Sequence, residues 1–346
     1  MIYYVPNLEL VGTLKFIKKM NEIVLNASEN TVTFDFSKMS NFDPLPMLVM
    51  GSAIKNFRKR HPNIRFYVAG TDSSGKGYAG TMGFFKYIST SLNLGKLPGE
   101  AHGSKNYIPI TPIAIDQIHQ EEIQNGRYLE LGDLIEEISG RLARIVDRGN
   151  AELHKLLTYL IREIIRNTPE HAGTNVSWVC GQYWPSYSLA EIAIADEGKG
   201  IFNSICQNSA HRQYITNNEL ALKWALKAGI SEAFRPSAKQ GSNDAWVNSG
   251  FGLYMVSEIC KYLKGSFCII SYGDYLLIDN HGVNAGKTFY QGTAIRMRVP
   301  CKKISNAQEI ISQIAHQGES EAKTIRHAFK HASLPSKGLM SELDLE

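Results

Sequence analysis

Residues 192–201 read Ile-Ala-Ile-Ala-Asp-Glu-Gly-Lys-Gly-Ile, and this stretch indicates how the larger part of the chain folds. Its apolar run predicts a buried strand that ends at Asp196. A carboxylate at a strand end can accept a hydrogen bond from an exocyclic amine, and Gly198 and Gly200 let the backbone approach a flat ring closely. Because ordinary acidic turns share this pattern, the stretch alone leaves both interpretations open.

A helix is expected before this strand. Residues 153–167 carry apolar side chains at helical spacing, whereas Glu163 and Asn167, four residues apart, point from one face. Simple solvent exposure would also explain this polar pair. Its meaning therefore depends on what lies near it in the fold.

Two glycine-containing turns follow later in the chain. Residues 248–253 read Asn-Ser-Gly-Phe-Gly-Leu and open a predicted helix. Backbone N–H groups at a helix N-terminus form a site suited to phosphates. Gly292 and Thr293 then open the last predicted strand, residues 294–299. Each turn alone is weak evidence of a binding site.

Taken together, the order and spacing of these segments resemble the GHKL (Bergerat-fold) ATPases, which include gyrase B subunits, MutL, chaperone ATPases and sensor histidine kinases. Residues 163–167 resemble the N box of that family, and residues 196–200 and 248–253 resemble its two glycine boxes. The resemblance covers roughly residues 150–300. It implies a Bergerat-type α/β sandwich with a mainly antiparallel sheet covered by helices on one face, so that the chain combines α/β and α+β parts.

The resemblance also implies a role for each motif residue. Asp196 would hold the adenine amine of ATP next to the first glycine box, with Thr293 assisting through water. Asn167 would coordinate Mg²⁺, which takes oxygen ligands and bridges the phosphates. The remaining nucleotide contacts would come from the backbone of the two glycine boxes, at Gly198, Gly200, Gly250, Phe251, Gly252 and Leu253.

Glu163 is the expected catalytic residue, because a Glu at this position orients and deprotonates the attacking water in the hydrolysing branches. In histidine kinases the same position often has a structural or phosphotransfer role. We therefore expect an ATP-binding switch with slow Mg²⁺-dependent ATPase activity. The alternatives are a protein kinase, either a histidine kinase or an anti-sigma-like serine kinase, and an ATP sensor that does not hydrolyse.

The chain departs from the family pattern in two places. Pro169 follows closely on the expected Mg²⁺ ligand and should kink or end the helix, placing Glu170 and His171 near the pocket mouth. Asn248 stands where a glycine is usual. Residues 203–248 correspond to the mobile ATP lid of the family. The candidate phosphate cations of the domain are Lys199, Arg212 and Lys239.

The first hundred residues alternate strand and helix patterns, which predicts an α/β layer. Residues 34–43 resemble the strand and turn that lead into the main helix of STAS domains. Residues 44–46 are Pro-Leu-Pro, which argues against a phosphoserine switch there. We expect a module for a protein partner or for homo-oligomerisation. Residues 70–77 nearly match a P-loop, but Gly77 stands where a hydroxyl is needed, so a turn is predicted.

These segments divide the chain into a STAS-like domain (1–100), a connector (101–128), an ATP-binding domain (129–300) and a helical, charged tail (301–346). A helix over residues 82–94 and a short strand over residues 107–110 are also expected.

The 346 residues carry a net charge of +4, which makes a nucleic-acid partner an unfavoured alternative. Five cysteines without a CxxC pair argue against disulfides or structural zinc. With no apolar run of membrane-spanning length, a cytoplasmic protein is expected.

Overall fold

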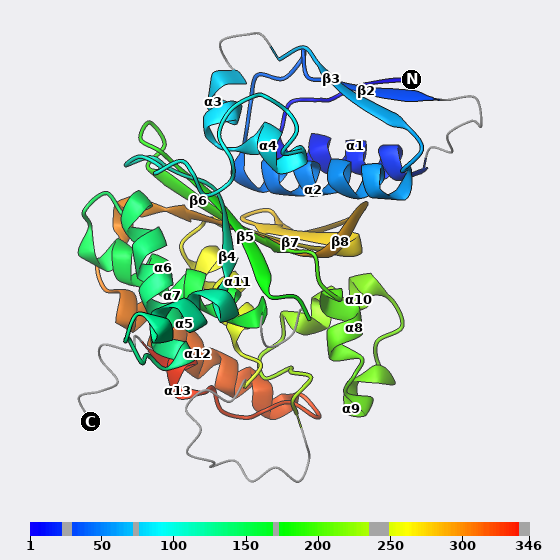
Figure 1. Ribbon diagram of the computed structural model, residues 1–346. Coiled ribbons are helices and arrows are strands. Elements are labelled where there is room, and N and C mark those ends of the chain that lie inside the picture. Colours follow the sequence, from blue (N-terminus) through cyan, green and yellow to red (C-terminus); the bar gives the residue numbers. More distant parts are fainter. Residues whose placement is uncertain (23–29, 72–75, 169–172, 235–248, 339–346) are drawn as a thin grey trace.

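The computed structural model describes residues 1–22, 30–71, 76–168, 173–234 and 249–338. This part of the chain has a mixed α/β fold with a three-stranded parallel sheet and a five-stranded antiparallel sheet (Figure 1). Within these ranges, no helix combines the length and the apolar character needed to cross a membrane.

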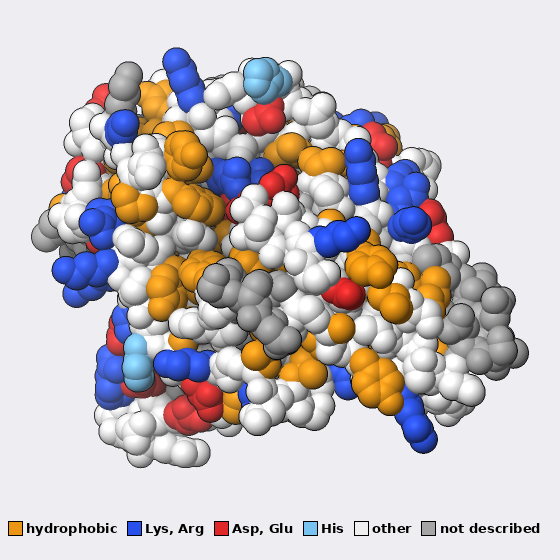
Figure 2. All heavy atoms as spheres, turned by 90° about the horizontal axis from the view of Figure 1, so that it is seen from above, with side chains coloured by type: hydrophobic (Ala, Val, Ile, Leu, Met, Phe, Trp, Pro, Cys, Tyr) orange, Lys and Arg blue, Asp and Glu red, His pale blue; other side chains and the backbone are white. Residues whose placement is uncertain are grey.

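The N-terminal sheet is parallel, in the order β1-β2-β3, and two helices pack beneath it (Figure 1). Its elements are β1 (Ile2–Tyr4), α1 (Leu10–Glu22), β2 (Thr31–Asp35), α2 (Pro44–Arg60) and β3 (Arg65–Ala69). Ile2, Tyr4 and Tyr67 are each more than half exposed on the other face. Figure 2 views the molecule from this side and shows hydrophobic side chains interspersed with Lys and Arg.

The helix expected over residues 82–94 forms only in part, as the short α4 (Phe84–Ile88), and a second short helix, α3 (Lys76–Thr81), precedes it. Gly83 separates them, because its φ of 84° is left-handed and cannot continue a right-handed helix. Ser89 is extended and ends α4.

The second sheet has the order β4-β5-β6-β8-β7, with every pair antiparallel. Its strands are β4 (Tyr107–Ala114), β5 (Val176–Trp184), β6 (Leu189–Asp196), β7 (Ser266–Asp279) and β8 (Gly282–Pro300). The segment expected as a connector thus supplies the edge strand β4, followed by α5 (Ile115–Gln124). The short strand expected there is four residues longer than its 107–110 range.

Helices cover both faces of the second sheet. One face packs on a core shared by α6 (Leu131–Val146), α7 (Ala151–Asn167), α11 (Gly252–Tyr262) and α12 (Ala307–Thr324). On the other face, α1 and α2 of the N-terminal unit lie against β5, β6 and β8 (Figure 1). Small buried side chains allow this close approach: Cys180, Ala193, Ala195, Cys268 and Ala294.

The C-terminal segment from Cys301, expected as a helical, charged tail, packs into the core of the second sheet. Ile311 and Ile314 of α12 are buried in the same cluster as α7 and α11. The chain then returns to α7 through the short helix α13 (Leu334–Lys337). This return brings residues far apart in the sequence next to the predicted catalytic helix.

Candidate functional site

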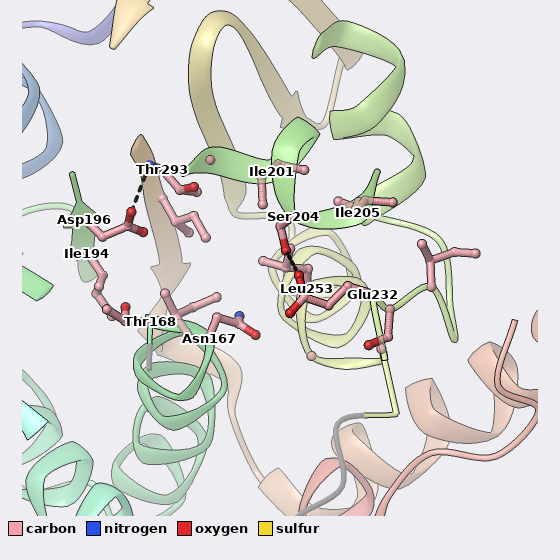
Figure 3. A pocket seen from close by; sticks show the side chains of 18 residues that line it. Asn167, Thr168, Ile194, Asp196, Ile201, Ser204, Ile205, Glu232, Leu253 and Thr293 are labelled. Atoms are coloured by element: carbon pink, nitrogen blue, oxygen red, sulfur yellow. Dashed lines mark hydrogen bonds between the residues drawn. The ribbon is translucent and has the colours of Figure 1, made fainter. Parts of the chain in front are cut away.

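A cavity lies between α7, the β6 and β8 strands, α11 and the segment 200–232 (Figure 3). Residues from four separate motifs line it. The predicted residues that line the cavity are Asn167, Asp196, Gly200, Gly250, Gly252, Leu253 and Thr293.

Asp196 occupies the end of β6, where it pairs with Thr293 of β8. The backbone N–H groups of Gly198 and Thr293 donate to its Oδ1 at 2.8 and 3.3 Å. Burial raises the pKa of Asp196 to about 6, against the lowering effect of those two hydrogen bonds, and the nearby Glu197 charge also raises it. A nearly buried carboxyl is therefore fixed with its side chain in the cavity.

The glycines around Asp196 have structural reasons for being glycine. Gly200 has a φ of 73°, and a Cβ there would lie 2.4 Å from the Tyr272 ring. Gly292, the residue before Thr293, has a φ of 107°, and a Cβ would lie 2.1 Å from the Asp196 carbonyl oxygen. Gly198 is placed in the turn rather than in the cavity lining, with its N–H bound to Asp196. These glycines shape the turn around the carboxyl.

Helix α7 ends at Asn167, with Thr168 at its C-cap, as the proline at 169 predicts. Asn167 lines the cavity, and its buried Nδ2 atom has no hydrogen-bond partner among the described residues. Thr168 also lines the cavity and accepts a hydrogen bond from Ser177 Oγ at 2.6 Å. Glu170 and His171, expected near the pocket mouth, lie outside the described residues.

The second glycine turn forms the opposite wall. Gly250 has a φ of 70°, and a Cβ there would lie 2.5 Å from the Ile230 backbone. Gly252 begins α11, with Leu253 beside it in the lining. Phe251 points into the core, where it is fully buried. Asn248, the unusual first residue of this motif, lies outside the described residues.

Glu163, the expected catalytic residue, is sealed beneath this wall rather than lining the cavity. Its Oε1 pairs with Arg162 Nη2 at 3.1 Å and its Oε2 with Arg166 Nη2 at 3.7 Å. Ser336 Oγ donates to Oε2 at 3.4 Å. A Cβ on Gly252 would lie 2.9 Å from Oε2, so the Gly252 backbone separates Glu163 from the cavity.

The C-terminal segment closes this cluster. Arg162 is fully buried, and its guanidinium donates to the carbonyl oxygens of Pro335 and Gly338 and to Glu136. Tyr159 OH donates to the Ser336 carbonyl at 3.0 Å. We refer to Glu136, Arg162, Glu163, Arg166 and Ser336 as the sealed cluster.

The segment expected to form a lid supplies the rest of the lining, through α8 (Gly200–Ile205), α10 (Asn218–Ala225) and residues 230–232. Buried Asn208 fixes this segment by donating to the carbonyl oxygens of Ser231, Glu232 and Phe234. Residues 235–248 of the expected lid, including Lys239, lie outside the described residues. Arg212 is exposed on α9 (Ser209–Arg212), away from the lining.

The sequence reasoning missed most of the apolar lining and one acidic residue. Ile194 and Ile295 pair across β6 and β8, and their alternation with Asp196 and Thr293 was a usable signal. Glu232 had no motif around it. The missed lining residues are Ile164, Thr168, Ile194, Ile201, Ser204, Ile205, Ala225, Ile230, Ser231, Glu232 and Ile295.

The cavity suits Mg²⁺ only in part. In the described part of the chain, no group of three or more His, Cys, Asp or Glu side chains could hold a metal ion. Among the oxygen-bearing side chains of the lining, Asn167 and Glu232 point into the cavity from different walls (Figure 3). Mg²⁺ is usually held by one or two protein oxygens together with phosphates and waters, so these residues fit a nucleotide-bound ion.

Comparison with known protein families, curated proteins and solved structures gave no match for this chain.

Proposed function

We propose that this cavity binds ATP with Mg²⁺ in the manner of the GHKL proteins and that the chain acts as a nucleotide-controlled switch. The observation that carries the proposal is the buried Asp196 carboxyl facing the cavity at the strand end. Among the described residues, both of its hydrogen bonds go to Oδ1, which leaves Oδ2 for a ligand amine. The isoleucine walls suit the faces of a purine ring.

The start of α11 is suited to bind the phosphate end of the ligand. Its first N–H groups follow Gly250, and an eleven-residue helix adds a favourable dipole. Asn167 would supply an oxygen ligand to Mg²⁺, which neutralises phosphate charge when bound. The described lining contains carboxylates and no Lys or Arg, so a polyphosphate needs an accompanying cation.

The N-terminal unit is proposed to be a STAS-like module that links a protein partner, or a second copy of the chain, to the nucleotide state. Ser52 Oγ and Lys55 Nζ of α2 bind the Glu197 carboxylate at 2.7 and 3.0 Å. Glu197 directly follows Asp196, so α2 contacts the turn that carries the residue proposed to bind adenine. The exposed Tyr4 and Tyr67 support a binding role for the outer sheet face, since parallel sheets are normally covered on both faces.

Slow ATP hydrolysis is a second candidate. Glu163 Oε2 lies directly behind Gly252, one residue from the cavity. A general base must reach the attacking water, so hydrolysis requires this carboxylate to leave its arginine partners. If Glu163 stays paired with its arginines, the same site would bind ATP without hydrolysing it and would serve as an ATP sensor.

Calorimetric titration of the purified chain with Mg²⁺ and ATP, GTP or CTP tests the binding proposal. ATP is expected to bind, whereas GTP should bind far more weakly because guanine presents a carbonyl where adenine has its amine. Equal affinity for ATP and GTP, or no binding, would contradict the proposal. Phosphate release that Glu163→Gln abolishes would establish hydrolysis, and its absence in the wild type would favour the sensor.

A further inference from the structure

Glu232 is an acidic side chain of the cavity that belongs to none of the four motifs. Its side chain is 17% exposed, and Figure 3 shows its carboxylate pointing into the cavity toward Ser204. The proposed nucleotide contacts assign it no role. An acidic group beside a phosphate site is unfavourable unless a cation lies between them.

The structure holds this carboxylate in place. Ser204 Oγ donates to Glu232 Oε2 at 2.5 Å, and Lys199 Nζ lies 3.3 Å from the same oxygen. Buried Asn208 fixes the backbone of residue 232 through its carbonyl oxygen. Two contacts on Oε2 therefore hold the carboxylate, and the Asn208 contact holds the backbone that carries it.

The charge of the cavity supports a metal-dependent ligand. The charged side chains of the described lining are Asp196 and Glu232, both acidic. Carboxylate and amide oxygens are ligands that Mg²⁺ and Mn²⁺ accept. Asn167, the other oxygen donor toward the phosphate end, lines the same cavity (Figure 3).

We propose that Glu232 completes a divalent-metal site with Asn167 and thereby makes nucleotide binding depend on the metal. Without a metal, Glu232 repels the phosphates and keeps Lys199 paired. When the metal nucleotide binds, Glu232 coordinates the cation and Lys199 turns to the phosphates. This inference rests on the proposed ATP site and adds a metal ligand and a phosphate-binding lysine to it.

The experiment compares ATP affinity in saturating Mg²⁺ and in EDTA for the wild type and Glu232→Gln. The metal ratio, which is the dissociation constant for ATP in EDTA divided by that in Mg²⁺, should fall by about tenfold or more in the variant. The reason is that the variant lacks one negative charge near the phosphates. Binding of Mn²⁺ in the presence of ADP, followed by electron paramagnetic resonance, should weaken by a similar factor. Glu219→Gln on α10, which lies outside the lining and pairs with Lys223, should leave both readings unchanged.

A second variant, Lys199→Met, keeps the proposal testable if Glu232→Gln does not fold. Lys199→Met should weaken binding of ATP in EDTA, since Glu232 then lacks its counter-charge, and should also weaken binding in Mg²⁺, since the phosphates lose the lysine. A wild-type ratio and Mn²⁺ spectrum in Glu232→Gln, or wild-type ATP affinity of Lys199→Met in both conditions, would overturn the Glu232 assignment alone. Failure of the wild type to bind ATP under any condition would overturn the proposed function and this inference with it.

Discussion

The last two turns of α7 lead into two very different environments. Asn167 faces an open cavity, whereas Glu163, one turn earlier on the same helix, lies in the sealed cluster. The spacing of the pair predicts a shared face, and the two environments are separated by little more than the Gly252 backbone. Spacing thus places side chains together, while the covering chain decides which of them can meet a ligand.

The sealed cluster is stable because its charges are paired. Burying an unpaired charge costs several kcal/mol, whereas Arg162 pairs with Glu163 and Glu136 and donates to two C-terminal carbonyl groups, which leaves its Nε as the guanidinium nitrogen without a partner among the described residues. The cavity has no such cover among the described residues. Its carboxyl, Asp196, is held by two backbone N–H groups and has a raised pKa.

The largest expected effect comes from breaking the sealed cluster. Arg162→Ala would leave Glu163 buried with a weaker counter-charge, so the free energy of unfolding should fall by about 3–5 kcal/mol in urea denaturation. Arg141→Ala, on the exposed side of α6, should change it by less than about 0.5 kcal/mol. Equal losses for the two variants would show that the cluster contributes nothing special.

The next largest effect concerns the cavity. In Asp196→Asn, the amide oxygen must accept the N–H groups of Gly198 and Thr293, so its NH₂ group faces the ligand amine. ATP affinity should fall by about 30- to 100-fold, from the loss of a charged hydrogen bond of about 2–3 kcal/mol. Asp279→Asn is the matched control, because Asp279 also accepts a backbone N–H, that of His281, but lies outside the cavity. Unchanged ATP affinity in Asp196→Asn would refute the adenine assignment.

A smaller effect is expected from pH. Burial raises the pKa of Asp196 to about 6, so ATP affinity should be constant above about pH 7 and fall about tenfold by pH 5 as the carboxyl gains its proton. The contribution of Asp196 to the free energy of unfolding has the opposite dependence on pH. Protonated Asp196 stabilises the free protein below its unfolded value of 3.8, and this contribution is lost as pH rises through about 6. ATP affinity and the free energy of unfolding are measured against pH for the wild type and Asp196→Asn. The difference between the two proteins separates Asp196 from Asp43, whose pKa is also raised to about 6 outside the cavity.

The smallest effect tests the contact between the tail and the cluster. Ser336→Ala removes the hydrogen bond to Glu163 and should lower the free energy of unfolding by about 1 kcal/mol, with ATP affinity unchanged. Ser320→Ala, an exposed serine of α12, serves as the control. A large loss of ATP affinity in Ser336→Ala would show that cluster and cavity are not separate.

Much of the cavity could be predicted from sequence because its residues sit on strongly patterned elements. The alternation of β6 and the apolar spacing of α7 placed Asp196 and Asn167 correctly in their elements. Long-range packing could not be predicted in this way. Nothing local to Glu163 indicates that the chain returns 173 residues later to cover it with Ser336.

Two further misses have different causes. Glu232 lies between helices without a motif, and its contacts with Ser204 and Lys199 come from other segments of the chain. The helix expected over residues 82–94 is shorter because Gly83 is left-handed and Ser89 is extended, and hydrophobic spacing encodes neither conformation.

Hydrogen-exchange mass spectrometry with and without Mg²⁺ and ATP tests the contrast between cavity and cluster most directly. We expect ATP to slow exchange in peptides covering the end of β6 through α8 and the start of α11. Peptides covering residues 333–338 should exchange at the same rate in both states. No protection near Asp196 and Gly252, or protection confined to the C-terminal segment, would contradict the placement of the nucleotide.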